Sequence, residues 1–321
     1  MTQSKIIIAT HGGAFHADDA FGVSVLLTLE PSASVMRTRN LNKIAQATYA
    51  VDVGGEWAPE QGRFDHHQKG FARTRADGTK YAAAGLVWER LGEAYVAALV
   101  PELKPAEVTR VAQTLDRELV RHIDMTDTGE GYSAEGQFGL SLLLANLNLT
   151  RLEEKRETWH PDKSLSEEQH RNEQQHARFM QAVNICQQFL ERLTLQLADE
   201  VLSESEVRQA TRHFDGRVLV LEETGLSWQK VVVEEMPDVL YVVFPDRADG
   251  GHMLQAVPTE VGGFTSRKRL PEQWAGLRFQ DLAAVTHVGS SVFCHNERFI
   301  AAAGTQADAL ELAQLALADP Q

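Results

Sequence analysis

The sequence contains 321 residues, of which 43% are hydrophobic and 24% are charged, an ordinary balance for a globular protein. Its 45 acidic and 31 basic residues give a net charge of −14, which argues against sequence-independent adhesion to nucleic acid through a basic surface. Two cysteines are too few for a disulfide framework, and no apolar run approaches the about 18 residues of a membrane span. We therefore expect a soluble, cytoplasmic protein with two domains.

Short apolar runs and amphipathic stretches alternate through the first part of the chain. Residues 5–10 are rich in β-branched side chains, which is typical of a buried parallel strand, and residues 17–30 have apolar residues at helical spacing. The alternation predicts an α/β fold, with a parallel sheet and helices on both faces. The expected strands are 5–10, 34–38, 49–53 and 63–65, and the expected helices are 17–30, 41–47, 82–99 and 105–123.

The second part of the chain begins with a change of composition. Residues 151–176 are rich in Glu, Arg, Gln and His, and they predict a solvated connection that becomes a long helix over about 166–200. Strands are then expected at 218–221, 231–233 and 240–244, and an Ala/Leu-rich helix at 306–318. The predicted organisation is a metal-binding catalytic domain, a helical connection and a smaller α+β C-terminal domain, over residues 1–150, 151–212 and 213–321.

Four polar clusters lie at the ends of predicted strands or helices. Ligands bind outside the carboxyl ends of strands in open α/β sheets, so we expect the clusters that follow strands to converge at one edge. They are His11 to Asp19, Asp52, the triplet Asp65-His66-His67, and Asp124 followed by Asp127.

The residue types in these clusters indicate a metal centre. Imidazoles and carboxylates without thiolates suit Mn²⁺, Fe²⁺, Co²⁺ or Zn²⁺. So many carboxylates can hold two cations roughly 3.5–4 Å apart, an arrangement that activates water and clamps a phosphoryl group. Asp52 is the candidate to bridge the two ions. Each residue alone has a structural explanation, such as a helix-dipole charge for Asp18, but four such clusters together favour a site.

The triplet Asp65-His66-His67 resembles the signature of the DHH phosphoesterase superfamily. Longer stretches resemble the melanocyte-proliferating-gene-one family, and the likeness spans nearly the whole chain. They are residues 10–19, 51–55, 64–71, 255–258, 264–267, 270–277 and 292–295. The resemblance implies a DHH-type first domain, a helical connection and a smaller C-terminal domain, with the active site between the domains. Eukaryotic members of the family are described as 3′–5′ RNA exonucleases.

The resemblance also implies roles for individual residues. His11 and Asp52 would hold one metal ion, while His67 would face the substrate phosphate and Asp65 would orient a histidine. The ligands implied for the other ion are Asp18, Asp52, His66 and Asp124. The first motif is longer than in many superfamily members, so either His16 replaces a carboxylate ligand or Asp19 takes part. We favour His16.

Basic residues elsewhere are candidates for substrate contacts. Arg267 is the preferred phosphate contact because its guanidinium can form a forked pair of hydrogen bonds. The further candidates in the second domain are Lys268, Arg269 and His295, and the alternative is that these are exposed loop charges. Arg37 and Arg39 end a predicted strand and could also reach the cleft.

The expected function is hydrolysis of phosphodiesters with two divalent ions, Mn²⁺ being the first choice. The expected substrates are RNA, short oligonucleotides or nucleotides, cleaved by a 3′–5′ exonuclease or oligonuclease. The alternatives are a small-molecule phosphatase or pyrophosphatase and a non-catalytic, metal-loaded nucleotide-binding module. No membrane partner is expected, and a homo-oligomer is left open.

Overall fold

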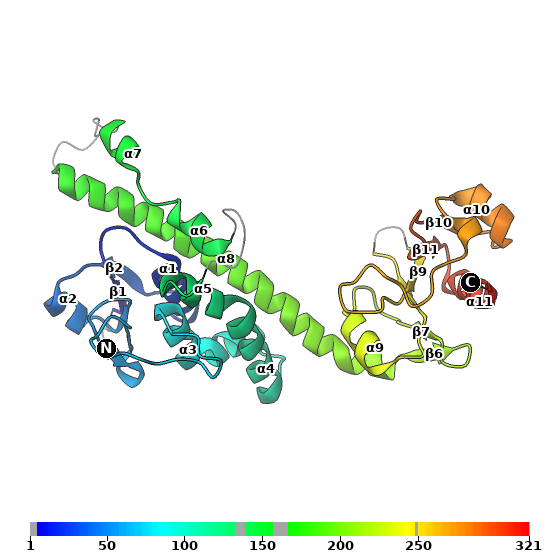
Figure 1. Ribbon diagram of the computed structural model, residues 1–321, viewed down its shortest axis with the longest axis horizontal. Helices are drawn as coiled ribbons and strands as arrows, with labels where there is room; N and C mark the ends of the chain where they lie inside the picture. The colour runs from blue at the N-terminus through cyan, green and yellow to red at the C-terminus, as the bar shows by residue number, and fades with distance from the viewer. Residues whose placement is uncertain (1–4, 132–138, 157–165, 248–249, 321) are drawn as a thin grey trace. The chain divides into compact units, whose positions relative to one another are not determined.

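The computed structural model describes residues 5–131, 139–156, 166–247 and 250–320 (Figure 1). The chain divides into two compact units, Met1–Ala198 and Asp199–Gln321. Each unit combines helices with one mixed sheet, which confirms the predicted α/β class. Within the described ranges, no helix is both long and apolar enough to cross a membrane. The functional boundaries at residues 150 and 212 stay predictions.

The sheet of the first unit has the strand order β2-β1-β3-β5-β4. Its first four members are parallel, as predicted, and β4 is an antiparallel edge strand that pairs with β5. Two residues are too few for a period-2 pattern, so the sequence contained no signal for β4. The strands are β1 (Ile7–Thr10), β2 (Ser34–Arg37), β3 (Tyr49–Val51), β4 (Trp57–Ala58) and β5 (Arg63–Phe64).

Helices cover both faces of this sheet. On one face, α1 (Ala17–Leu29) contacts β1 and β3, and α3 (Ala83–Leu99) contacts β5. Gly22 allows this approach, because a Cβ at that position would lie 2.7 Å from Val51 Cγ1. On the other face, α2 (Leu41–Gln46) packs Ile44 against alternate strand residues, and the Asn40 side chain caps its first turn.

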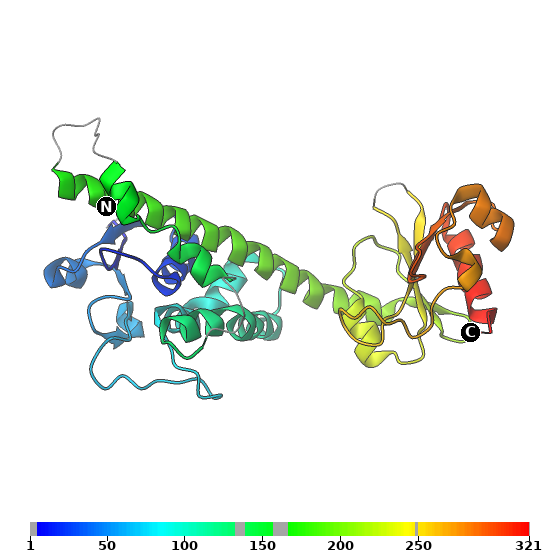
Figure 2. The same ribbon diagram turned by 45° about the horizontal axis from the view of Figure 1, so that its top comes forward.

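The predicted helix over 105–123 is interrupted. It consists of α4 (Pro105–Leu115), a π-helical turn (Asp116–Val120) and α5 (Arg121–Asp127). Two short helices follow, α6 (Leu140–Ala145) and α7 (Arg151–Arg156), and the expected long helix is α8 (Glu167–Gln209). Both views show α8 passing alongside α6 in the first unit (Figure 1, Figure 2).

The second unit is built on a six-stranded sheet in the order β10-β11-β9-β8-β7-β6. Strand residues alternate between two cores: Val218 and Val220 pack with α10 and α11, whereas Leu219 and Leu221 pack with α9. The strands are β6 (Thr211–His213), β7 (Val218–Val220), β8 (Tyr241–Pro245), β9 (His252–Ala256), β10 (Ser291–Cys294) and β11 (Ile300–Ala303). The helices are α9 (Gln229–Glu235), α10 (Phe279–Thr286) and α11 (Gln306–Ala318), and short 3₁₀ turns lie at Pro59–Gln61 and Glu272–Trp274.

The strand predicted at residues 231–233 is wrong, because this segment belongs to α9. Three consecutive valines favour a strand by composition, but β7 and β8 are parallel. Parallel neighbours require a crossover connection, which is usually a helix. Tertiary topology therefore overrides the β propensity of the valines, and Val231 and Val232 become the buried side of the crossover helix.

Candidate metal centre

The strand ends of the first sheet bring the predicted polar clusters together. His11 follows β1, Asp52 follows β3, and the triplet that ends at His67 follows β5. These strands are parallel neighbours, so their carboxyl ends lie at the same edge. His16 and Asp18 open α1, and Asp127 ends α5. The centre is thus assembled from three strand ends and two helix ends.

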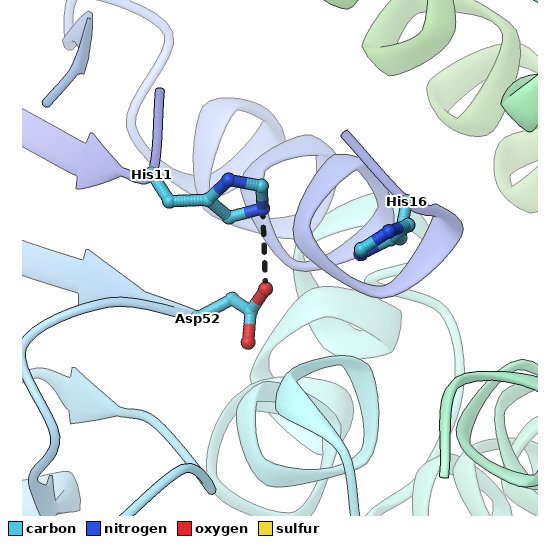
Figure 3. A group of neighbouring side chains, drawn as sticks. All are labelled: His11, His16 and Asp52. Atoms are coloured by element: carbon cyan, nitrogen blue, oxygen red, sulfur yellow. Dashed lines mark ion pairs between the residues drawn. The ribbon is translucent and has the colours of Figure 1, made fainter. Parts of the chain in front are cut away.

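Asp52 lies at the middle of the centre. Its Oδ2 is 3.3 Å from His11 Nε2 (Figure 3), and its Oδ1 is 3.3 Å from both His66 Nε2 and His67 Nδ1. Burial alone would raise the Asp52 pKa, but the three imidazoles hold it well below its usual range. One carboxylate therefore serves two sides of the site, as the bridging role requires.

A second set of ligand atoms lies beside the first. His66 Nε2 is 3.4 Å from Asp127 Oδ2 and 3.9 Å from Asp18 Oδ2, and His16 Nδ1 is 3.7 Å from Asp127 Oδ1. Among the described residues, three groups of potential ligand atoms result, each confined within 4.8 Å: His11, His16 and Asp52; Asp52, His66 and His67; and His16, Asp18 and Asp127. The groups share residues, so they form one continuous cluster.

His16 and Asp19 are the two candidates for the ligand from the first motif, and their hydrogen bonds differ. Asp19 Oδ1 accepts hydrogen bonds from the backbone amides of His16 (3.0 Å) and Ala20 (2.8 Å), as a helix-capping carboxylate does. Asp19 Oδ2 lies 3.1 Å from His11 Nε2. In Figure 3 the His16 ring lies near His11 and Asp52, and its side chain is 59% exposed. His16 thus presents an exposed ring beside the other potential ligands, whereas Asp19 has one oxygen bound to backbone amides of the helix.

The charges of the site suit cations. Both carboxylate oxygens of Asp18 are buried and accept no hydrogen bond from the described residues. Burial, followed by the charges of Asp52 and Asp127, raises the Asp18 pKa well above its usual value. Burial would lower the pKa of His11, yet Asp19 and Asp52 outweigh it and raise that pKa to about 10. Buried carboxylates without donors are costly unless they are paired or coordinate a metal, so the residues present fit divalent ions.

His67 is oriented by Asp65. Asp65 Oδ1 lies 2.9 Å from His67 Nδ1 and accepts from the His67 amide at 3.1 Å, while Asp65 Oδ2 accepts from the Gly55 amide at 2.5 Å. The hydrogen bond with Asp52 raises the His67 pKa, burial opposes this rise, and the hydrogen bond with Asp65 adds to it. The resulting pKa is about 9. The ring is 64% exposed, so a protonated donor faces outward from the centre.

Asp124 does not join the cluster. Its Oδ2 lies 2.7 Å from Arg75 Nη1, and its Oδ1 accepts from the Gly85 amide at 2.9 Å in the first turn of α3. A Cβ at Gly85 would lie 1.9 Å from Asp124 Oδ2, so this carboxylate occupies the space of the missing side chain. Burial, opposed by Arg75, raises the Asp124 pKa to about 7. Asp127, which we noted but did not select, is the residue of this pair that faces the histidines.

The sequence could not choose between these two aspartates. They lie three residues apart at the end of one predicted helix, and either could follow the motif order. The signal that distinguishes them is the partner: Arg75 Nη1 lies 2.7 Å from Asp124 Oδ2, and Asp116 binds the same guanidinium at 2.7 and 2.9 Å. That long-range contact exists only in the folded chain.

Two predicted phosphate contacts in the second unit have other partners. Arg267 donates to four carbonyl oxygens at 2.7–3.2 Å, so it caps the C-terminal end of α9 instead of presenting its guanidinium for a substrate. Lys268 Nζ likewise donates to the carbonyls of Leu317 and Asp319 at the end of α11. These donors are occupied, and the expected forked contact is corrected on that ground.

Arg269 and His295 remain exposed. Within the described part of the chain, the Arg269 side chain forms no ion pair. His295 Nδ1 accepts from the Glu297 amide at 3.1 Å, and its ring lies 4.5 Å from that of Phe299. In the first unit, Arg39 lies at the centre, with Nη2 3.4 Å from His11 Nδ1. Arg37 instead contacts the loop that precedes α1.

Comparisons with known proteins identify a family for this chain. The MYG1 exonuclease family model, described as Uncharacterised protein family (UPF0160), matches residues 7–317. MYG1 exonuclease of Rattus norvegicus is 31% identical, and the match covers 97% of this chain and 84% of that protein. MYG1 exonuclease of Homo sapiens is 29% identical, with coverage of 99% and 88%. MYG1 protein of Chlamydia trachomatis is 26% identical, with coverage of 97% and 96%. Because the family match spans almost the whole sequence, this chain belongs to the MYG1 family.

Proposed function

We propose that this chain is a metal-dependent phosphodiesterase that acts as a 3′–5′ exonuclease or oligonuclease on RNA or short oligonucleotides. The observation that carries the proposal is the cluster of three ligand groups that share Asp52 and His16. In a purely structural role, the buried Asp18 carboxylate, which accepts no hydrogen bond from the described residues, would be costly. The relatives named MYG1 exonuclease support a nuclease over other phosphoesterases.

Two divalent ions, Mn²⁺ first, are proposed as cofactors. His11, His16 and Asp52 would hold one ion. The proposed ligands of the other are Asp18, Asp52, His66 and Asp127. Asp127 takes the place that we first gave to Asp124, because the Asp124 carboxylate is bound to Arg75 and the Gly85 amide. Mixed imidazole and carboxylate ligands suit Mn²⁺ among the common divalent ions.

When bound, the pair of cations would supply activation of water and neutralisation of phosphoryl charge. The residues of the chain then have separate tasks. His67, held through Nδ1 by Asp65, donates a hydrogen bond from Nε2 to a phosphoryl oxygen. Its raised pKa keeps the ring protonated at neutral pH, which makes that hydrogen bond charge-assisted. Arg39 lies beside His11 and is a further candidate contact for the substrate backbone.

A panel of substrates tests the proposal. The Mn²⁺-loaded chain would be incubated with a short RNA, the matching DNA, a cyclic dinucleotide and pyrophosphate. We expect RNA labelled at its 5′ end to give a ladder of products shortened one nucleotide at a time. RNA labelled at its 3′ end should release labelled mononucleotide at once. Turnover of pyrophosphate without cleavage of RNA would support the phosphatase alternative, and binding without turnover of any substrate would support a non-catalytic module.

A further inference from the structure

Arg37 connects β2 to the loop between β1 and α1, residues 11–16. Its Nη2 donates to the Gly13 carbonyl at 2.6 Å, and its Nη1 donates to the Gln175 carbonyl of α8 at 3.4 Å. The guanidinium carbon lies 4.8 Å from the ring centre of Phe179 and 5.6 Å from that of Phe15. Arg37 is therefore held between a buried aromatic pair and the loop, away from the position of a substrate contact.

Asn148 and Gln175 complete this contact from two other elements. The Asn148 amide accepts from the Phe15 N–H at 2.9 Å and donates to the Phe15 carbonyl at 2.9 Å. Gln175 Nε2 donates to Asn148 Oδ1 at 2.5 Å and to the Gly13 carbonyl at 3.3 Å. Both backbone polar groups of Phe15 are thus bound by a side chain 133 residues away in the sequence.

The loop also has other restraints, since Asp19 Oδ1 accepts from the His16 amide and Arg39 Nε donates to the Gly12 carbonyl, but its two glycines leave the stretch between these contacts dependent on further support. Gly12 and Gly13 have no atom within 4 Å of a would-be Cβ, and Gly13 has a φ of +94°. Glycine loses more conformational freedom on ordering than any other residue. His16 follows Phe15 directly, and its side chain is 59% exposed, so packing does not place the ring. The backbone of the loop, together with the Asp127 carboxylate 3.7 Å from Nδ1, therefore sets where the His16 ring lies.

We propose that Arg37, Asn148 and Gln175 form a loop bracket, a set of positioning residues that holds His16 in place beside His11 and Asp52. The identity of the group that His16 binds rests on the proposed function, whereas the bracket rests on the hydrogen bonds. Hydrogen-bonding partners behind a metal ligand typically change metal affinity about 10- to 100-fold when they are removed.

Calorimetric titration of the full chain with Mn²⁺ tests the bracket. Gln175→Leu and Asn148→Leu should each weaken the binding of one ion about 10-fold or more and leave the second ion within about twofold. Gln187→Leu is the matched control, because Gln187 lies on the same helix and its side chain donates to Thr28 Oγ1 at 3.3 Å, away from the loop. It should bind both ions normally. Arg37→Lys should retain part of the affinity, since a lysine keeps one donor for the Gly13 carbonyl.

Amide hydrogen exchange provides a readout without metal. The Phe15 amide should exchange about 10-fold faster in Gln175→Leu and Asn148→Leu than in Gln187→Leu, at an unchanged Tm. Normal affinity for both ions together with normal exchange at Phe15 would overturn the bracket. If the unmodified chain bound no Mn²⁺, the proposed function would fail, and the exchange rates would still decide whether the bracket exists.

Discussion

Asp52 adopts a backbone φ of +55°, a left-handed conformation that residues other than glycine rarely occupy. Such conformations persist where the surroundings determine them strongly, and they concentrate at functional sites. Here the conformation brings both carboxylate oxygens within 3.3 Å of imidazole nitrogens from two different strand ends. At the scale of the residue, the strain at Asp52 is explained by its central place in the cluster.

The two aspartates of α5 should separate metal binding from stability. Asp127→Asn removes a ligand of the second ion, so the dialysed protein should retain about one Mn²⁺ per chain instead of two. Asp124→Asn should retain both ions and lose on the order of 1–3 kcal/mol of stability, because a buried hydrogen-bonded charge is removed. Metal analysis and urea unfolding measure the two effects. The opposite pattern would return Asp124 to the ligand set.

His67→Ala should lose activity and keep its metal. The side chain is exposed and is held by Asp65, so its removal leaves the other ligand groups intact. Loss of one donor to a developing charge typically lowers kcat by about 10²- to 10³-fold. Steady-state kinetics and metal analysis of the same preparation check this. A mutant that retained only one ion would mean that His67 is a ligand and that its role is exchanged with that of His66.

Uptake of Mn²⁺ should strengthen as the pH rises. His11 has a raised pKa of about 10, so at neutral pH the metal-free site holds a proton that a bound ion must displace. Affinity for that ion should rise by up to about tenfold per pH unit and level off near pH 10. Titrations at pH 7 in two buffers of different ionisation enthalpy report proton release. Uptake without proton release would show that His11 is neutral or is not a ligand.

At the scale of the element, Arg267 completes α9 instead of a substrate site. Its four hydrogen bonds satisfy carbonyls from Val232 to Val239, at the end of the helix that connects β7 to β8. Two of them also accept from backbone amides, Val232 from Met236 and Met236 from Val239, and the guanidinium adds donors at a helix end, where the last turn leaves acceptors unfilled. A single guanidinium therefore stabilises the crossover on which the parallel pair depends.

Arg267→Ala should destabilise the second unit by about 2–4 kcal/mol, because several charge-assisted hydrogen bonds to buried acceptors are lost together. Arg208→Ala is the control: Arg208 lies on the surface, where it pairs with Glu235 and Glu204, so this substitution should change the stability much less. Urea unfolding monitored through Trp228 and Trp274 gives both values. Unchanged stability with a raised KM for RNA would instead favour the phosphate contact that we first expected.

At the scale of the molecule, every proposed metal ligand lies in the first unit, between His11 and Asp127. Residues 1–198 expressed alone should therefore bind two Mn²⁺ ions. They lack the exposed Arg269 and His295, so we expect slower cleavage of RNA than in the full chain, since positioning of the substrate is a large part of catalysis. Metal analysis tests the expected binding of two ions, and the labelled-RNA assay tests the expected slower cleavage. Full activity of residues 1–198 would place all substrate contacts in the first unit.

Local patterns predicted much of the fold. Helical spacing of apolar residues located α1, composition located α8 and α11, and short apolar runs located most strands. The parallel strand order then implied that His11, Asp52 and the triplet meet at one sheet edge, because parallel strands end together. Those inferences depend only on the spacing of residues along the chain.

Tertiary contacts decided the rest. The valines at 231–233 became a helix because a parallel crossover needs one, and Asp127 faces the histidines because Arg75 binds Asp124 from a distant loop. The sequence favoured Arg267 as a phosphate contact, but in the folded chain its donors bind carbonyls at the end of α9. The partner of a charged side chain depends on which groups lie within hydrogen-bonding distance after folding. The spacing of residues along the sequence does not give that distance.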